Sequence, residues 1–298
     1  MLDYKKSDPF GTKLSLEEAL AEYDKSFEMR WRQVLKDFKA ETEDAIHICG
    51  PSSYLFTLAG EKIAVDPQIR RTSDFALVED TLKDTFGSLS AILITHEHDD
   101  HFCTPLARLL KDTDVLYYLP FGIRERWVEE SELPPERIRY VHPGDVFQIG
   151  AVTVRGFESP HVPVGADHTL VECGYELSTP RGRVLLPGDI REYAYTAYPA
   201  CLHAPDVCIT HVWAGNDAIH PEQYLPRMER CADFFARFGA KKYLLGHLYE
   251  IGRAQLYMWD MDHAAILTKS LKERMPSCEV GVPLLGHGYR LFSCEEIK

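Results

Sequence analysis

The sequence lacks the features of a membrane or secreted protein. No apolar run approaches the ~20 residues that a helix needs to cross a bilayer. The first residues, Met-Leu-Asp-Tyr-Lys-Lys-Ser-Asp, have no apolar core behind their charges, so they do not resemble a secretory signal. We therefore expect a cytoplasmic protein with no membrane partner.

Positive charge is also scarce. The chain has 33 Lys and Arg residues against 46 Asp and Glu residues, a formal net charge of −13. Binding to nucleic acid depends on Lys and Arg side chains that neutralise phosphates, so a nucleic-acid partner is not expected. A small-molecule substrate is expected instead, and it can be anionic where bound metal ions dominate the local field.

Paired cysteines are absent. None of the eight cysteines forms a C-x-x-C pair, and an even count does not make a disulfide framework in a chain of this length. We expect reduced thiols. No strong repeat, low-complexity tract or linker divides the 298 residues, which suit one large domain or two small ones.

The N-terminal region has a helical pattern. Ser15 and Glu18 have the spacing of a capping box, and apolar residues then recur at helical spacing to Phe38. We expect residues 1–42 to form an arm and an amphipathic helix, ahead of a main domain at 43–298. The apolar stripe of this helix would pack on that domain or on a second copy in a homo-oligomer.

The rest of the chain alternates short strands with helices. Strands are expected at 45–49, 54–58, 62–65, 115–119, 138–142, 145–149, 152–157, 168–177, 184–186, 207–210 and 243–245. Helices are expected within 75–86 and at 104–111, 123–130, 221–238 and 254–274. Periodicity alone therefore indicates a mixed α and β protein.

The densest chemistry lies in residues 92–101, Ile-Leu-Ile-Thr-His-Glu-His-Asp-Asp-His. Residues 92–95 predict a short buried strand. Side chains two apart share a face of extended backbone, so His96 and His98 can bind one metal ion. A turn after His98 would let Asp100 and His101 face a second ion. The alternative, a solvated acidic loop with incidental histidines, is disfavoured by this density at a strand end.

This string resembles the signature of the metallo-β-lactamase-fold hydrolases, and the resemblance extends over about residues 45–250. It implies an α+β fold, a four-layer αβ/βα sandwich. It also implies that His161, Asp189 and His247 are later metal ligands and that Asp66 is a supporting acid. The first ion would take His96, His98 and His161. The second would take Asp100, His101 and His247, with Asp189 reaching both.

The resemblance implies two divalent ions that share a hydroxide, the nucleophile of a hydrolysis. Asp100 and Asp189 are then the catalytic carboxylates. Nitrogen and oxygen ligands suit zinc or manganese, and iron also fits. His211 follows a strand too and competes with His247 as a ligand. His211, Asn216 and Arg253 are otherwise substrate or supporting candidates, with surface or packing roles as the alternative.

Within the family, the Ser-Ser-Tyr-Leu-Phe hairpin at 52–56 most resembles the L-ascorbate-6-phosphate lactonase-like group. A hydrolase of a small ester or lactone, with phosphorylated sugar acids among the candidates, is the leading expectation. A phosphodiesterase of the same fold is the nearest alternative. A non-catalytic metal-binding protein is the other, because a fold alone does not establish activity.

Overall fold

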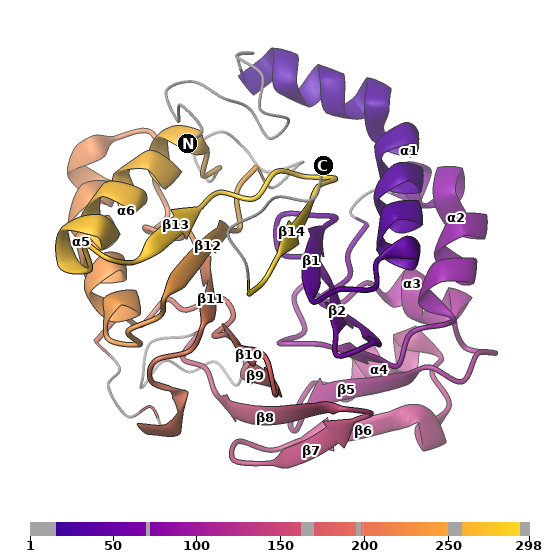
Figure 1. The fold of residues 1–298 in the computed structure, drawn as a ribbon. Coiled ribbons are helices and arrows are strands. Elements are labelled where there is room, and N and C mark those ends of the chain that lie inside the picture. Colours follow the sequence, from indigo (N-terminus) through magenta and orange to yellow (C-terminus); the bar gives the residue numbers. More distant parts are fainter. Residues whose placement is uncertain are drawn as a thin grey trace.

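Two mixed β-sheets face each other in the computed structural model, with helices on both outer sides (Figure 1). The structure describes residues 16–69, 72–161, 170–194, 198, 200–249 and 258–292. Within these ranges, no helix is long and apolar enough to cross a membrane. The seven cysteines in these ranges are all free thiols.

The first sheet has seven strands and comes mostly from the N-terminal half. Their spatial order is β14 (Gly288–Arg290), β1 (Ala45–Ile48), β2 (Tyr54–Leu58), β3 (Glu61–Val65), β4 (Ala91–Leu93), β5 (Leu116–Pro120) and β6 (Ile138–Val141). β1, β2 and β3 pair antiparallel, whereas β3, β4, β5 and β6 run parallel. The carboxyl ends of β3 and β4 therefore lie at the same edge of the sheet.

The second sheet also has seven strands and comes mostly from the C-terminal half. Its order is β13 (Glu279–Gly281), β12 (Lys242–Gly246), β11 (Val207–His211), β10 (Gly182–Leu186), β9 (Cys173–Thr179), β8 (Val152–Glu158) and β7 (Val146–Ile149). β10, β11 and β12 are parallel, and β9 is antiparallel to both β8 and β10. The carboxyl ends of β8, β10, β11 and β12 therefore share one edge.

Helices cover the outer faces in two groups. α1 (Leu16–Ala40), α2 (Thr72–Phe86), α3 (Thr104–Leu109) and α4 (Glu125–Ser131) cover the first sheet, and α5 (Pro221–Ala236) and α6 (Met261–Arg274) cover the second (Figure 1). Short 3₁₀ turns lie at Pro135–Arg137 and Ala200–Leu202. One apolar core lies between the sheets and one under each helical layer. This is the four-layer αβ/βα sandwich that the sequence predicted.

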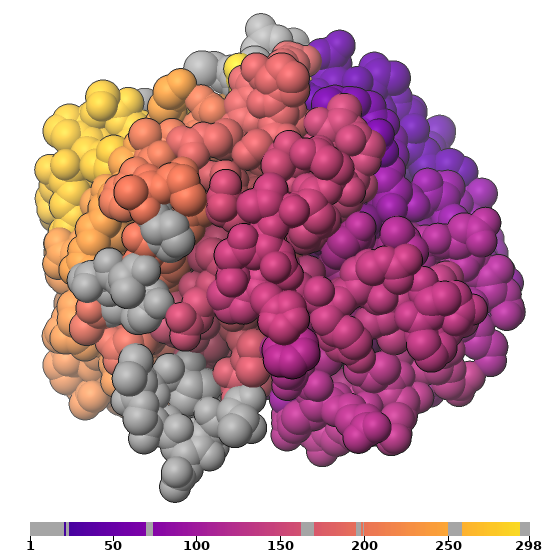
Figure 2. Space-filling model, turned by 90° about the horizontal axis from the view of Figure 1, so that it is seen from below, coloured from indigo at the N-terminus to yellow at the C-terminus, as the bar shows by residue number. Residues whose placement is uncertain are grey.

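The apolar stripe of α1 packs within the chain. Phe27, Trp31 and Phe38 are buried in the same core as α2 and the first sheet. At the surface, Arg32 pairs with Asp80 and Lys39 with Asp84, so two ion pairs also connect α1 and α2. Seen from below, the two halves of the chain lie side by side, the first indigo to magenta and the second orange to yellow (Figure 2).

Some predicted boundaries were wrong. β4 ends at Leu93 and not at Thr95, because the Thr95 N–H donates to Asp66 Oδ1 at 2.7 Å and leaves the sheet. β9 begins at Cys173 and residues 170–172 are not strand, because β8 ends at Glu158 and Cys173 is the last residue that it pairs with. α6 begins at Met261, because Asp260 caps it by accepting from two backbone N–H groups, and the predicted start at Ala254 lies outside the described residues. β13 and β14 were not predicted, since three residues carry no periodic signal.

Candidate metal centre

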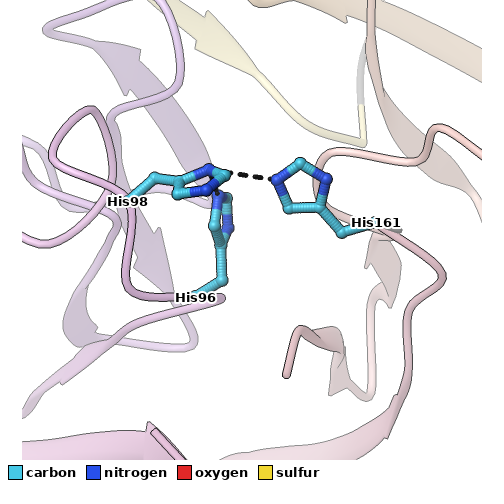
Figure 3. Close-up of side chains that lie close together, drawn as sticks. All are labelled: His96, His98 and His161. Atoms are coloured by element: carbon cyan, nitrogen blue, oxygen red, sulfur yellow. Dashed lines mark hydrogen bonds between the residues drawn. The ribbon is translucent and has the colours of Figure 1, made fainter. Parts of the chain in front are cut away.

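Three histidines from two parts of the chain form a first cluster at the shared edge of the sheets. His96 and His98 lie in the loop after β4, and His161 follows β8. His96 Nε2 and His161 Nε2 lie 3.0 and 3.1 Å from His98 Nδ1, so the three rings point toward one another (Figure 3). Zinc–nitrogen bonds of ~2.0–2.1 Å in a tetrahedron place ligand atoms about 3.3 Å apart. The three nitrogens are therefore close to one face of a metal coordination shell.

The first cluster is neutral at neutral pH. Burial lowers the pKa of His161 to about 3 and holds the pKa of His96 well below its usual value. Burial also lowers the pKa of His98, which is the partly exposed member. A metal ligand must have a free lone pair, so neutral rings suit metal binding. The partial exposure of His98 marks the open side of the cluster.

Glu172 lies behind His96 and was missed from the sequence. Its Oε1 is 3.3 Å from His96 Nδ1 and accepts the Asp189 N–H at 2.6 Å. Its Oε2 accepts from the Ser159 hydroxyl at 2.9 Å. Burial and then the charge of Asp189 raise the pKa of Glu172 to about 8. His96 Nδ1 also lies 3.1 Å from the Thr95 hydroxyl oxygen. With Nδ1 facing Thr95 and Glu172, His96 turns Nε2 toward the other two histidines.

A second cluster contains Asp100, His101, Asp189 and His247, whose ligand atoms all lie within 4.8 Å of one another. Asp189 Oδ2 is 3.2 Å from His247 Nε2 and 3.5 Å from His101 Nε2. Asp100 Oδ2 lies 3.8 and 4.0 Å from the same two nitrogens. The two clusters adjoin, since the His96 and His101 rings are 4.0 Å apart between centroids.

Asp66 orients His101. This aspartate directly follows β3, and its Oδ2 accepts from His101 Nδ1 at 2.7 Å and from the Thr95 hydroxyl at 2.6 Å. Asp66 adopts a φ of 47°, a conformation that Asp tolerates better than most residues. Its contact with Nδ1 directs His101 Nε2 toward Asp100 and Asp189. This is the supporting geometry expected for Asp66.

His211 and His247 differ in what their ring nitrogens contact. His211 Nδ1 donates to Asp189 Oδ1 at 2.6 Å, and the Tyr54 hydroxyl donates to its Nε2 at 2.8 Å. Both nitrogens of His211 are therefore occupied. His247 Nε2 instead faces the two carboxylates of the second cluster, from a backbone at φ 62° that donates to Pro51 O at 2.6 Å. His247 lies in the cluster, and His211 orients Asp189.

The carboxylates and histidines of the second cluster shift one another's pKa values. Burial alone would lower the pKa of His101, but Asp189 and Asp66 outweigh it and hold that pKa well above its usual value. Burial would raise the pKa of Asp189, but His247 and His101 hold it well below. The buried Nε2 of His101 makes no hydrogen bond and is directed at carboxylate oxygens. A divalent cation would satisfy this nitrogen and both acids, so the donor set fits a metal ion.

Two further candidates from the sequence are outside these clusters. Asn216 is exposed in the loop after β11, and no hydrogen bond links it to the described residues of either cluster. Arg253 lies outside the described residues. The structure adds Arg191, which was also missed and whose Nη2 is 3.9 Å from Asp189 Oδ2. An arginine two residues after the Gly188-Asp189 turn was the available signal.

Known proteins resemble this chain in sequence and in fold. A UPF0173 protein of Pyrococcus furiosus is 29% identical over 114 residues, 38% of this chain and 47% of that protein. A similar match exists in Pyrococcus abyssi, and the chain thus spans about half the length of the curated relatives it matches. Among solved structures, a possible metal-dependent hydrolase from Veillonella parvula has a TM-score of 0.60 at 14% identity, over 84% of this chain and 100% of that one.

Yeast PDE1, in its unliganded form, has a TM-score of 0.57 at 13% identity, over 83% of this chain and 99% of that one. At such low identity, both structures show a shared fold only. The model of the beta-lactamase superfamily domain matches residues 45–229, which is more than half of the chain. This match includes the loop after β4, His161 and Asp189. The chain therefore belongs to the beta-lactamase superfamily and has the metallo-β-lactamase fold of metal-dependent hydrolases.

Proposed function

We propose that this protein is a dinuclear metal-dependent hydrolase of a small ester or lactone. His96, His98 and His161 would bind one divalent ion, and Asp100, His101, Asp189 and His247 the other. Bound zinc or manganese would supply a water of lowered pKa as the nucleophile and a Lewis acid for the substrate oxygen. Iron suits the same ligands.

The main support for this proposal is that two different sets of donor side chains lie next to each other. One is made of three neutral imidazoles, and the other combines two histidines with two carboxylates. Six of the seven side chains are buried, and His98 is partly exposed, so the substrate would approach from the His98 side. A structural zinc site has four protein ligands and no open position, whereas the first cluster offers three.

The chain's own residues have distinct tasks in this proposal. Asp189 is held by His211 on Oδ1 and by Glu172 on its backbone N–H, which leaves Oδ2 to face the clusters. Asp100 Oδ2 lies at the edge of the second cluster, where it can take up the proton lost by the attacking water. Glu172 and Asp66 keep His96 and His101 in the required orientation.

The proposal is tested by metal analysis and by substrate panels on the metal-loaded protein. We expect about two tightly bound divalent ions per chain and turnover of lactones or carboxylic esters. His96→Ala and Asp189→Ala should each lower turnover at least about 100-fold. His203→Ala, which removes an exposed histidine outside both clusters, is the matched control. Full turnover in both cluster variants would refute the proposal.

The same measurements distinguish the alternatives. Turnover of bis(4-nitrophenyl) phosphate without turnover of lactones would favour a phosphodiesterase. Less than one bound ion per chain, under conditions that preserve metals, would favour a non-catalytic protein. A lactone substrate related to L-ascorbate 6-phosphate is the specific choice that the hairpin at residues 52–56 suggests.

The remaining expectations from composition are part of the proposal. We infer a cytoplasmic location, a small-molecule substrate and no nucleic-acid or membrane partner, on the basis of the net charge of −13 and the absence of long apolar runs. A homo-oligomer stays a prediction. The apolar stripe of α1 that suggested it is buried within the chain.

A further inference from the structure

Two arginines stack on one tryptophan beside the candidate metal centre. The Arg191 guanidinium lies 5.2 Å from the centroid of the Trp213 ring, and the Arg227 guanidinium lies 5.3 Å from it. Arg191 is in the loop after β10, Trp213 in the loop after β11, and Arg227 in α5. Cation–π contacts occur within about 6 Å, so both arginines are held by the same ring.

The group formed by Arg191, Trp213 and Arg227 borders the open side of the metal centre. Arg191 Nη2 is 3.9 Å from Asp189 Oδ2, and the Arg191 N–H donates to Pro160 O at 3.2 Å, next to His161. Arg191 therefore lies beside His161, whose Nε2 is 3.1 Å from Nδ1 of the partly exposed His98, where a substrate would enter.

Trp213 is held in place by hydrogen bonding, and the positive charges of Arg191 and Arg227 are not fully neutralised by acidic side chains. The Tyr193 hydroxyl donates to Trp213 O at 2.6 Å, so a buried tyrosine anchors the tryptophan. Within the described residues, Arg191 Nε is buried without a hydrogen-bond partner and Arg227 makes no ion pair. Asp217, in the same loop as Trp213, forms an ion pair with His220 at 2.8 Å. Metal ions would offset the charge of Asp189, which leaves the arginines available to another anion.

We propose that Arg191, Trp213 and Arg227 form a subsite for an anionic group, a carboxylate or a phosphate, carried by the substrate away from the bond that is cleaved. Guanidinium groups present planar pairs of N–H donors that match both oxyanions. The subsite would select anionic esters or lactones in an otherwise acidic protein. It specifies the substrate class of the proposed hydrolase and rests on that proposal for the position of the cleaved bond.

The test uses two pairs of probes that differ only in a terminal carboxylate. Succinamate and butyramide measure binding to the metal-loaded protein by calorimetry. 4-Nitrophenyl hemisuccinate and 4-nitrophenyl butyrate measure hydrolysis. We expect a preference for the anionic member of each pair. Arg227→Gln should reduce this preference at least about tenfold, the loss expected for one hydrogen bond to a charged group. 2-Phosphoglycolate against glycolate, which both carry a carboxylate, measures what an added phosphate contributes to binding.

Matched variants control for charge and folding. Arg126→Gln removes an exposed arginine stacked on Trp127 at the same 5.3 Å, so the preference should persist. Arg191→Lys keeps the charge beside Asp189 but loses the planar pair of donors, and it should also weaken the preference. An equal loss in Arg126→Gln and Arg227→Gln, or no anion preference in the unaltered protein, would overturn the subsite. If binding keeps the preference while no ester is hydrolysed, the hydrolase proposal fails and the subsite stands.

Discussion

Glu172 Oε1 and His96 Nδ1 lie 3.3 Å apart, and both side chains are completely buried. A buried carboxylate costs several kcal/mol unless it is neutralised or fully hydrogen-bonded, and burial accordingly raises the pKa of Glu172 to about 8. Glu172 also accepts the backbone N–H of Asp189. A single side chain therefore connects a member of the first cluster with a member of the second.

Glu172→Gln is expected to weaken metal binding at the first cluster about 10- to 100-fold, because an amide can place an N–H group where the Glu172 oxygen now faces His96 Nδ1. Competition with a chelator measures the affinity of the metal-free protein for zinc. Glu176→Gln is the control, since Glu176 is also buried in this region but pairs with Arg183 at 3.0 Å. An unchanged affinity in Glu172→Gln would show that the contact is structural only.

His247→Ala should reduce the metal content to about one ion per chain, because His247 Nε2 faces both carboxylates of the second cluster. His211→Ala should retain two ions, with the second bound less tightly, because His211 contacts Asp189 from outside the cluster. Elemental analysis after dialysis gives both stoichiometries. The opposite pattern would make His211 the ligand.

Gly188→Ala should destabilise the protein and also weaken the first metal site. Gly188 has a φ of 81°, and an added Cβ would overlap Glu172 Oε1. Gly144→Ala is the matched control, because Gly144 has a φ of 98° with open space around its Cβ position. The control should lose about 1 kcal/mol of stability from backbone strain alone and keep its metal affinity. Equal effects in the two variants on zinc affinity would exclude the clash with Glu172.

His47 should make the metal-free protein less stable as the pH falls. Burial lowers the pKa of His47 to about 4 in β1, where its ring contacts Phe38 and its Nδ1 makes no hydrogen bond. Its pKa in the unfolded chain is about 6.5, so the unfolded state takes up a proton first and stability is lost as the pH falls through this range. Between about pH 7 and pH 5 the loss from this residue is about 2 kcal/mol.

His47→Leu should remove that component, measured as the difference in urea denaturation at the two pH values. His203→Leu replaces an exposed histidine and should keep the full loss. An identical pH response in His47→Leu and the unaltered protein would show that other groups carry the acid sensitivity.

The amino-acid sequence by itself determined the fold family and the ligand types. Four candidate ligands, three histidines and one aspartate, lie in residues 96–101, and short apolar strands precede His161, Asp189 and His247. Strand ends and residue identity are local properties, so periodicity and motif spacing can predict them. The same reasoning did not identify the cap at Asp260, where α6 begins.

Asp66 apart, tertiary structure decided which side chains support the site. His211 and His247 both end apolar strands, and only the positions of Tyr54 and Asp189 distinguish them. Glu172 and Arg191 carry no motif, and they become informative only when β9 and β10 bring them beside His96 and Trp213. The physical reason is that hydrogen bonds and burial depend on distances between segments far apart in the chain, which a local pattern does not encode.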